Sequence, residues 1–207
     1  MQREDKKLRE ALTKLGEEFY QRTNVVQIAR ELLGKTLYTR IDGIMTGGMI
    51  VETEAYSWKE RGSHAYNNRR TTRNEIMFGT GGFTYVYLCY GIHNLFNVVT
   101  NRESVAEAVL IRALEPVAGE EYMIKRTKAK NSKKITSGPG KLTKALGIDR
   151  KMNAKYLLED EIWIEDAAQV AKNKIVTGSR IGIDYAGEDA SLPWRFQIKD
   201  NPWVSKP

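Results

Sequence analysis

Two carboxylates separated by a single residue stand near the first quarter of the chain, in the segment Met49-Ile50-Val51-Glu52-Thr53-Glu54-Ala55-Tyr56. Because side chains alternate across a β-strand, Glu52, Glu54 and Tyr56 would share one face of a strand. A carboxylate there could act as a general base that activates water, and the aromatic ring could wall a pocket for a flat ligand. A polar strand face exposed to solvent is the alternative, and the pattern alone favours that alternative.

Positive charge is concentrated in two segments that contain no acidic residue. The chain has a formal net charge of +7, with four arginines in residues 61–74 and eight lysines and arginines in residues 122–148. Arginine binds phosphate through paired hydrogen bonds, and neighbouring Ser, Thr and Asn side chains add neutral donors. The distribution predicts a face that binds nucleic-acid phosphates, but a solvated helix face and a mobile basic loop would explain it equally well.

Aromatic side chains crowd the segment from Phe83 to Tyr90. Phe83, Tyr85 and Tyr87 would share one face of a strand, which is typical of a hydrophobic core. Tyr90 falls at the turn that follows, beside Gly91, where a core role explains it poorly. In a protein that binds nucleic acid, an aromatic residue at such a turn could act as a wedge between bases or as a stacking platform.

Two further features are compatible with either binding or structure. His64, within the arginine-rich segment, could line a pocket, although a hydrogen-bonded structural histidine is favoured by the pattern. Ser137-Gly138-Pro139-Gly140-Lys141-Leu142 precedes a predicted helix, whose N-terminal N–H groups could bind a phosphate. The spacing of its glycines differs from that of a Walker A motif, and a plain turn at a helix start explains it equally well.

The hydrophobic periodicity predicts helices on both sides of a strand-rich centre. Helices are expected at 3–19, 24–33, 119–130 and 140–146, and strands at 36–41, 48–56, 83–90, 96–100, 108–114, 161–165, 176–183 and 195–198. Pro116 is expected to end the central run of strands. Since the helices do not alternate with the strands, we expect an α+β fold, with a curved, mostly antiparallel or mixed sheet flanked by helices. No repeat or linker divides the chain, so residues 1–207 are expected to form a single domain.

The composition excludes several classes of protein. Cys89 is the only cysteine and there are two histidines, which excludes an internal disulfide framework and a cysteine-rich zinc site. No apolar run approaches the roughly 20 residues of a membrane helix, and the charged N-terminus lacks the apolar stretch of a signal peptide. We therefore expect a cytoplasmic protein, nucleoid-associated in a bacterium, with no metal, no cofactor and no membrane partner.

Six motifs together resemble the alkyladenine (3-methyladenine) DNA glycosylase family. They lie in order and at compatible spacing from about Phe19 to Ser205. They are Ile50–Tyr56, the His64–Asn74 loop, Tyr85–Gly91, Val109–Pro116, Ser137–Leu142 and Pro202–Ser205. The resemblance implies a monofunctional enzyme that flips a damaged purine out of duplex DNA and removes it with water as the nucleophile.

The resemblance also implies roles for individual residues. Glu54 would be the catalytic base that deprotonates the attacking water, and Arg112 would help to hold that water. The flipped base would be enclosed by Tyr56, His64 and Tyr87, with Asn97 at the pocket floor opposing the amino group of a normal guanine. Tyr90 would enter the minor groove, while Arg69, Thr71 and Arg73 would lie along the phosphate-binding loop. Glu52 receives no role in the chemistry.

The expected partner is double-stranded DNA that contains damaged purines such as 3-methyladenine, hypoxanthine or etheno-adenine, bound by a monomer. Thr72 stands where the family often has proline, and His93 where it often has an aromatic residue. The first departure would loosen the arginine-rich loop, and the second leaves the groove contacts of the turn open. The alternative function is a non-catalytic nucleic-acid-binding domain that keeps the basic face and an aromatic wedge.

Overall fold

One long strand, Ile44–Ser57, pairs with three other strands and so connects the parts of the sheet. The computed structural model describes residues 13–206. The strands are β1 (Thr36–Ile41), β2 (Ile44–Ser57), β3 (Thr84–Cys89), β4 (His93–Thr100), β5 (Glu107–Ala118), β6 (Ile162–Glu165), β7 (Ile175–Gly178) and β8 (Arg195–Ile198). These eight form one sheet in the order β3-β4-β5-β2-β1-β6, and β8 pairs with both β2 and β7. The pairings between these strands are all antiparallel.

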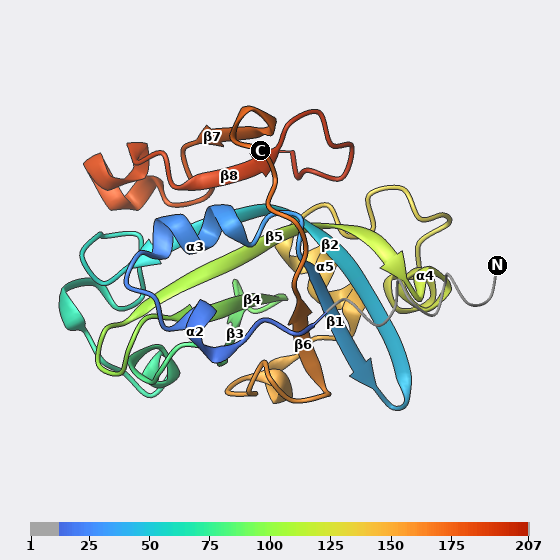
Figure 1. Cartoon of the computed structure of the whole chain (residues 1–207), viewed down its shortest axis with the longest axis horizontal. Helices are drawn as coiled ribbons and strands as arrows, with labels where there is room; N and C mark the ends of the chain where they lie inside the picture. Colours follow the sequence, from blue (N-terminus) through green and yellow to red (C-terminus); the bar gives the residue numbers. More distant parts are fainter. Residues whose placement is uncertain (1–12, 207) are drawn as a thin grey trace.

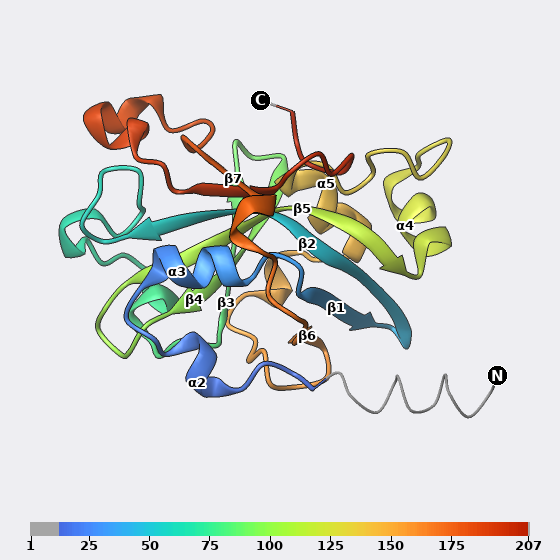
Figure 2. The same cartoon turned by 45° about the horizontal axis from the view of Figure 1, so that its top comes forward.

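Short helices cover the sheet and its edges. The α-helices are α2 (Glu17–Tyr20), α3 (Val25–Glu31), α4 (Glu120–Thr127) and α5 (Pro139–Leu146), and the 3₁₀ helices are η1 (Tyr66–Asn68), η2 (Glu75–Phe78), η3 (Arg150–Met152), η4 (Lys172–Lys174) and η5 (Asp184–Ser191). Helix α3 packs against β2 and β5, and α5 packs against β4 and β5. Figure 1 shows α3 lying across the strongly twisted β5 and β2, and Figure 2 shows the same layers tilted forward. The predicted α+β class is therefore confirmed.

Local sequence explains where the first elements begin and end. The Asn24 side chain accepts a hydrogen bond from the backbone of Gln27 (3.0 Å), which caps α3 as short polar residues do. After α3, Gly34 adopts a positive φ of 84°. The β1–β2 hairpin turns at Asp42 and Gly43, both with positive φ, as expected for a two-residue loop.

Two irregularities oppose each other where β2 and β5 cross the centre of the sheet. Ile50 pairs with Leu114 and Glu52 with Ala113, so Val51 is an extra residue in β2. The next pair, Thr53 with Ile111, leaves Arg112 as an extra residue in β5. Bulges of this kind redirect side chains and are common beside active sites. The buried carboxylates of β2 and the guanidinium of Arg112 meet at this irregularity.

A predicted helix and a predicted strand differ from the structure over several residues. For the helix predicted at 3–19, residues 3–12 lie outside the described residues. Residues 13–16 are not helical, because Lys14 forms a β-bridge with Glu165 and the backbone N–H of Leu15 donates to the carbonyl of Ile164. The strand predicted at 176–183 ends at Gly178, and the following residues turn toward the sheet.

Pro116 does not end the central strand, since β5 continues to Ala118. The N–H of Leu114 points away from β2, to the carbonyl of Thr136. Two residues further on, the Pro116 nitrogen points to that same side, away from the β2 ladder. Proline is tolerated in a strand where its nitrogen faces no ladder partner, which the sequence pattern did not reveal.

Two hydrophobic clusters support this arrangement. The larger lies between the helices and the centre of the sheet and includes Ile28, Leu32, Phe96, Ile111 and Leu142. The smaller packs the residues that flank the arginine-rich loop against β3, β4 and β5. It contains Ala65, Met77, Phe78, Tyr85, Val99, Ala106 and Ala108. Among residues 13–206, no helix combines the length and apolar character that a membrane crossing requires.

Candidate active site

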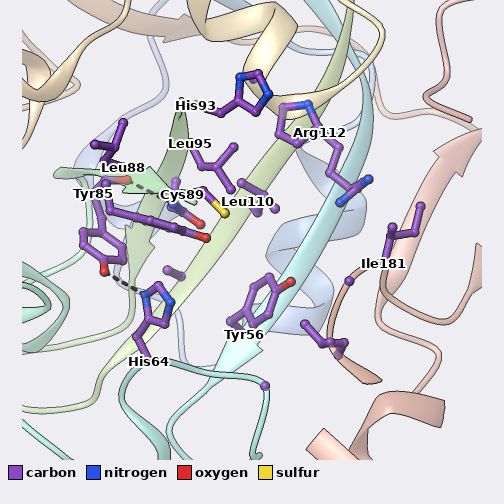
Figure 3. Close-up of a pocket in the computed structure, with 18 of the residues that line it drawn as sticks. Tyr56, His64, Tyr85, Leu88, Cys89, His93, Leu95, Leu110, Arg112 and Ile181 are labelled. Carbon is purple, nitrogen blue, oxygen red and sulfur yellow. Dashed lines mark hydrogen bonds between the residues drawn. The ribbon is translucent and has the colours of Figure 1, made fainter. Parts of the chain in front are cut away.

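A cavity of about 640 Å³ opens at the centre of the sheet, between β3, β5, the start of α5 and the segment 181–185. Its lining includes most of the predicted site residues, namely Tyr56, His64, Arg73, Tyr87, Tyr90, Asn97 and Arg112. Figure 3 shows Tyr56, His64 and Arg112 around this cavity, with Ile181 on the side opposite Leu88 and Cys89. Glu54 lies behind Tyr56 and Arg112, whereas Arg69 and Thr71 lie outside the lining.

The Glu54 carboxylate is fully buried, so the interpretation of a solvent-exposed strand face is wrong. Its Oε2 accepts a hydrogen bond from the Tyr56 hydroxyl (2.9 Å), and its Oε1 accepts one from the backbone N–H of Ile181 (2.8 Å). The Arg112 Nη1 lies 3.2 Å from the same Oε1. Burial raises the pKa of Glu54 above its ordinary value, while Arg112 and the two hydrogen bonds limit the rise.

The same arginine is shared with a second buried carboxylate, Glu52. Arg112 Nε donates to Glu52 Oε1 (3.0 Å), and Arg195 Nη1 donates to the same oxygen (3.2 Å). The backbone N–H of Ser205 donates to Glu52 Oε2 (2.8 Å). Burial alone would lower the pKa of Arg112, but Glu54 and Glu52 raise it overall, so the guanidinium stays charged between them.

Aromatic rings and a histidine form one wall of the cavity. The His64 Nδ1 lies 2.8 Å from the Tyr85 hydroxyl, and its ring meets Tyr87 edge to face at 4.6 Å between centroids. Burial, followed by the charge of Arg73, lowers the pKa of His64 to about 4, so the imidazole is neutral at pH 7. Burial raises the pKa of Tyr85 to about 12. The wall is therefore uncharged and suited to a flat ring.

Asn97 lies on β4 at the bottom of the cavity and is buried. Its Nδ2 donates to the carbonyl of Tyr85 (3.0 Å), which fixes the orientation of the amide. Tyr85, which the sequence pattern assigned to the core, thus holds both His64 and Asn97 and also lines the cavity.

Tyr90 stands at the rim and is 87% exposed, on the β3–β4 turn with a positive φ of 49°. A large aromatic residue held outside the core in this way is consistent with the predicted wedge. His93, at the start of β4, packs over Gly140, where an added Cβ would lie 2.7 Å from the imidazole. The glycine therefore lets the start of α5 approach the turn closely.

The loop 65–74 keeps its arginines at the surface, with Arg69, Thr71 and Arg73 all exposed. Arg70 forms an ion pair with Glu75, which directly follows the acid-free segment. One of the positive charges of the loop is therefore compensated. The Arg73 guanidinium lies over the Tyr87 ring, 4.8 Å from the centroid. Only Arg73 of these residues reaches the cavity.

Asn74, which the sequence reasoning missed, organises this loop. The buried Asn74 side chain donates to the carbonyls of His64 (2.9 Å) and Arg69 (2.8 Å) and accepts from the Thr71 backbone (2.7 Å). These bonds tie the loop to the cavity wall, even though Thr72 replaces the proline that is common in the family.

A second missed element is the segment from Arg180 to Tyr185. The Arg180 guanidinium is buried, forms an ion pair with Glu60 (2.7 Å), donates to the carbonyl of Ala55 (3.0 Å) and covers the Tyr56 ring at 4.8 Å. The next residue, Ile181, supplies the N–H to Glu54. The only signal in the sequence was an arginine in a short segment bounded by glycines, Gly178-Ser179-Arg180-Ile181-Gly182.

Metal ligands are scarce around the cavity. Within residues 13–206, no three or more His, Cys, Asp or Glu side chains gather closely enough to hold a metal ion. The charged groups that the cavity does offer are Arg73, Arg112 and Lys141 in its lining, with the Glu54 carboxylate behind it.

Comparison with known proteins gives the class of this chain, which is a DNA-repair hydrolase, a DNA glycosylase. The model of the methylpurine-DNA glycosylase family matches residues 18–202. This chain belongs to that family. The non-catalytic binding domain considered from the sequence is thus not supported.

Relatives of similar length share one name, "Putative 3-methyladenine DNA glycosylase". The chain is 42% identical to the one from Desulfitobacterium hafniense over 203 residues, covering 94% of this chain and 99% of the relative. It is 44% identical to the one from Natranaerobius thermophilus over 196 residues (93% and 98% covered). It is 47% identical to the one from Methanocella arvoryzae over 195 residues (93% and 96% covered).

Proposed function

We propose that this enzyme hydrolyses the glycosidic bond of alkylated and deaminated purines, including 3-methyladenine, hypoxanthine and etheno-adenine, in duplex DNA. One observation carries the proposal: a buried carboxylate, Glu54, is hydrogen-bonded to Tyr56 and paired with Arg112 directly behind an aromatic cavity. We further propose that residues 1–207 act as one domain and as a monomer.

A water molecule would reach Glu54 through Oε2. A carboxylate oxygen can accept about two hydrogen bonds. Oε1 already accepts a hydrogen bond from the backbone N–H of Ile181 and is paired with Arg112, whereas Oε2 accepts a hydrogen bond only from the Tyr56 hydroxyl. Tyr56 and Arg112 both bond Glu54 and line the cavity, so we place the attacking water at the remaining position on Oε2.

In the proposed reaction the water oxygen bonds to the anomeric carbon, one water proton passes to Glu54, and the bond to the purine nitrogen breaks with its electron pair on the purine. A cationic alkylated purine then leaves as a neutral base, whereas a neutral purine such as hypoxanthine takes up a proton as it leaves. A raised pKa makes the Glu54 carboxylate a better proton acceptor, and the charge of Arg112 limits the rise. Because no lysine sits in a motif that suggests a Schiff base and water is the proposed nucleophile, cleavage of the DNA strand is not expected.

The cavity wall suits the proposed substrates. A base must leave the stack before it can react, at a cost of a few kcal/mol. Tyr90, filling the gap in the duplex, would offset that cost, and Tyr56, His64 and Tyr87 would enclose the base. Alkylation at a ring nitrogen makes a purine cationic, which aromatic faces attract and which eases departure. Asn97 would oppose the exocyclic amino group of guanine.

Single-turnover excision tests the proposal. The substrates are a duplex with one hypoxanthine, methylated duplex DNA and an undamaged duplex of the same sequence. We expect release of the damaged base only, with no release by Glu54→Gln and near-normal DNA binding by that variant. Lack of release from both damaged substrates by the wild-type enzyme would contradict the proposed substrate class.

A further inference from the structure

A second exposed tyrosine, Tyr185 of η5, stands at the cavity and has no role so far. Its side chain is 70% exposed and lines the cavity together with Tyr90. The two rings come from different parts of the chain, one from the β3–β4 turn and one from the segment after Ile181. An aromatic ring at the mouth of a base-binding cavity offers a stacking surface to any of the bases.

The Tyr185 ring is held in place rather than left free. Its hydroxyl donates to the carbonyl of Gly62 (3.2 Å), and the neighbouring Ile183 and Ala186 are buried. Burial, followed by the Glu60 carboxylate, raises the pKa of Tyr185, so the hydroxyl keeps its proton and remains a donor at neutral pH. A side chain fixed before binding loses little conformational entropy when it contacts a ligand.

The loop that carries Tyr185 is anchored at both ends. At its start, Arg180 is buried against Glu60 and Ala55. At its end, the Asp189 side chain accepts the backbone N–H of Arg61 (2.9 Å), and the Asp189 carbonyl accepts from Arg180 (3.1 Å). These contacts fix the loop that presents the ring.

The loop that carries Tyr185 forms one side of the cavity. Figure 3 shows Ile181 on one side of the cavity and Leu88 with Cys89 on the other. Gly182, the next residue, lines the cavity, and an added Cβ there would meet no atom within 4 Å, so this side is open. A nucleotide that leaves the duplex at Tyr90 would enter between these two sides.

We propose that Tyr185 is a positioning residue that packs its ring against the everted purine nucleotide at the cavity mouth and retains it there. This inference rests on the proposed function, because it requires a flipped nucleotide. It assigns to Tyr90 the opening of the duplex and to Tyr185 the retention of the nucleotide after it has left the stack.

The test separates retention from DNA binding and from folding. A hypoxanthine duplex with 2-aminopurine beside the lesion reports flipping by fluorescence, single-turnover excision at saturating enzyme reports retention, and an undamaged duplex reports general affinity. The variants are Tyr185→Ala, Tyr185→Phe, which keeps the ring, and Tyr122→Ala, which removes an exposed tyrosine of α4 outside the cavity lining.

Tyr185→Ala should lower the excision rate about 5- to 50-fold and reduce the fluorescence change, the size expected for losing one base–aromatic stack. Its affinity for undamaged duplex and its thermal midpoint should stay near wild type. Tyr185→Phe and Tyr122→Ala should stay within about twofold in every assay. The phenylalanine variant shows whether the ring itself acts, because it lacks the bond to Gly62.

Two results would overturn the inference while leaving the proposed function intact. One is wild-type excision and fluorescence by Tyr185→Ala. The other is an equal loss of affinity for damaged and undamaged duplex, which would make the ring a general DNA contact. If wild-type enzyme neither flips nor excises hypoxanthine, and releases nothing from methylated DNA, the proposed function itself fails.

Discussion

Glu52 and Glu54 are two residues apart on β2 and equally buried, but they lie in different surroundings. Both oxygens of Glu52 accept hydrogen bonds, Oε1 from Arg112 and Arg195 and Oε2 from the backbone N–H of Ser205. Glu54 shares Arg112 with it, but lies behind the cavity-lining Tyr56, and its Oε2 accepts only from the Tyr56 hydroxyl.

The contrast shows how one strand can carry both a carboxylate that stabilises the site and a carboxylate proposed to act in the reaction. Two arginines and two carboxylates balance in this cluster, so the buried charges compensate each other. Glu52 holds Arg112 by its Nε, and Arg112 then presents Nη1 to Glu54. Glu52 therefore acts through Arg112, whereas we propose that Glu54 acts on the water.

The largest effect is expected for Glu54→Gln. Loss of a general base typically costs about 10²- to 10⁴-fold in rate. The amide oxygen can accept from Ile181 while the NH2 group donates to the Tyr56 hydroxyl, and Arg112 stays paired with Glu52, so the thermal midpoint should change less than in a Glu52 variant. Single-turnover excision beside thermal unfolding measures both. A large loss of stability with a matching loss of activity would remove the contrast between the two carboxylates.

The complementary variant, Glu52→Gln, should act mainly on stability. Removing the Glu52 charge leaves the buried Arg112 and the half-buried Arg195 with less negative charge beside them, which should lower the free energy of unfolding by about 3 kcal/mol. Urea unfolding measures this cost, and excision under conditions where the variant is folded should fall less than in Glu54→Gln. A stable variant with the larger loss of excision would reverse the two roles.

His64 contrasts with the two carboxylates, because it is a half-buried group on the cavity wall that should stay neutral at pH 7. Its pKa in the folded protein is about 4, below the ordinary 6.5. The unfolded chain therefore takes up a proton more readily, and stability should fall from about pH 6.5 to pH 4 and then level off. The loss is at most about 3 kcal/mol.

Urea unfolding at several pH values, for wild type and His64→Gln, tests this expectation. The variant should lose that part of the pH dependence, because glutamine does not titrate. Equal slopes in the two proteins between pH 6.5 and pH 4 would show that other groups cause the effect.

The smallest effect concerns the arginine-rich loop, which lies on the cavity side of the comparison. Arg69→Gln with Arg73→Gln should flatten the dependence of log affinity on log salt by about one unit for each DNA phosphate that the variant no longer neutralises. Binding of duplex at several salt concentrations measures this slope. Lys172→Gln, at an exposed lysine of η4 outside the cavity lining, is the control and should leave the slope unchanged.

Features that depend only on neighbouring residues could be predicted from the sequence. Strand alternation correctly placed Glu52 and Glu54 on one face, since both contact Arg112. The helix expected at 24–33 and the exposed turn at Tyr90 also followed from local residue preferences. The resemblance named most of the residues that the structure then gathers around one cavity, although Arg69 and Thr71 lie outside its lining and the roles of all of them remain proposals.

Burial of the strand face that carries Glu52 and Glu54, and the distant groups that bond these carboxylates, became known only from the tertiary structure. Glu54 is bonded by Ile181, 127 residues away, and Glu52 by Ser205, 153 residues away. Such contacts leave no periodic pattern in the sequence, because either partner alone resembles an ordinary loop residue. Burial of the carboxylates, the opposed bulges at Val51 and Arg112, and the ring of Tyr185 at the cavity all depend on how the sheet curves and where distant segments return to it.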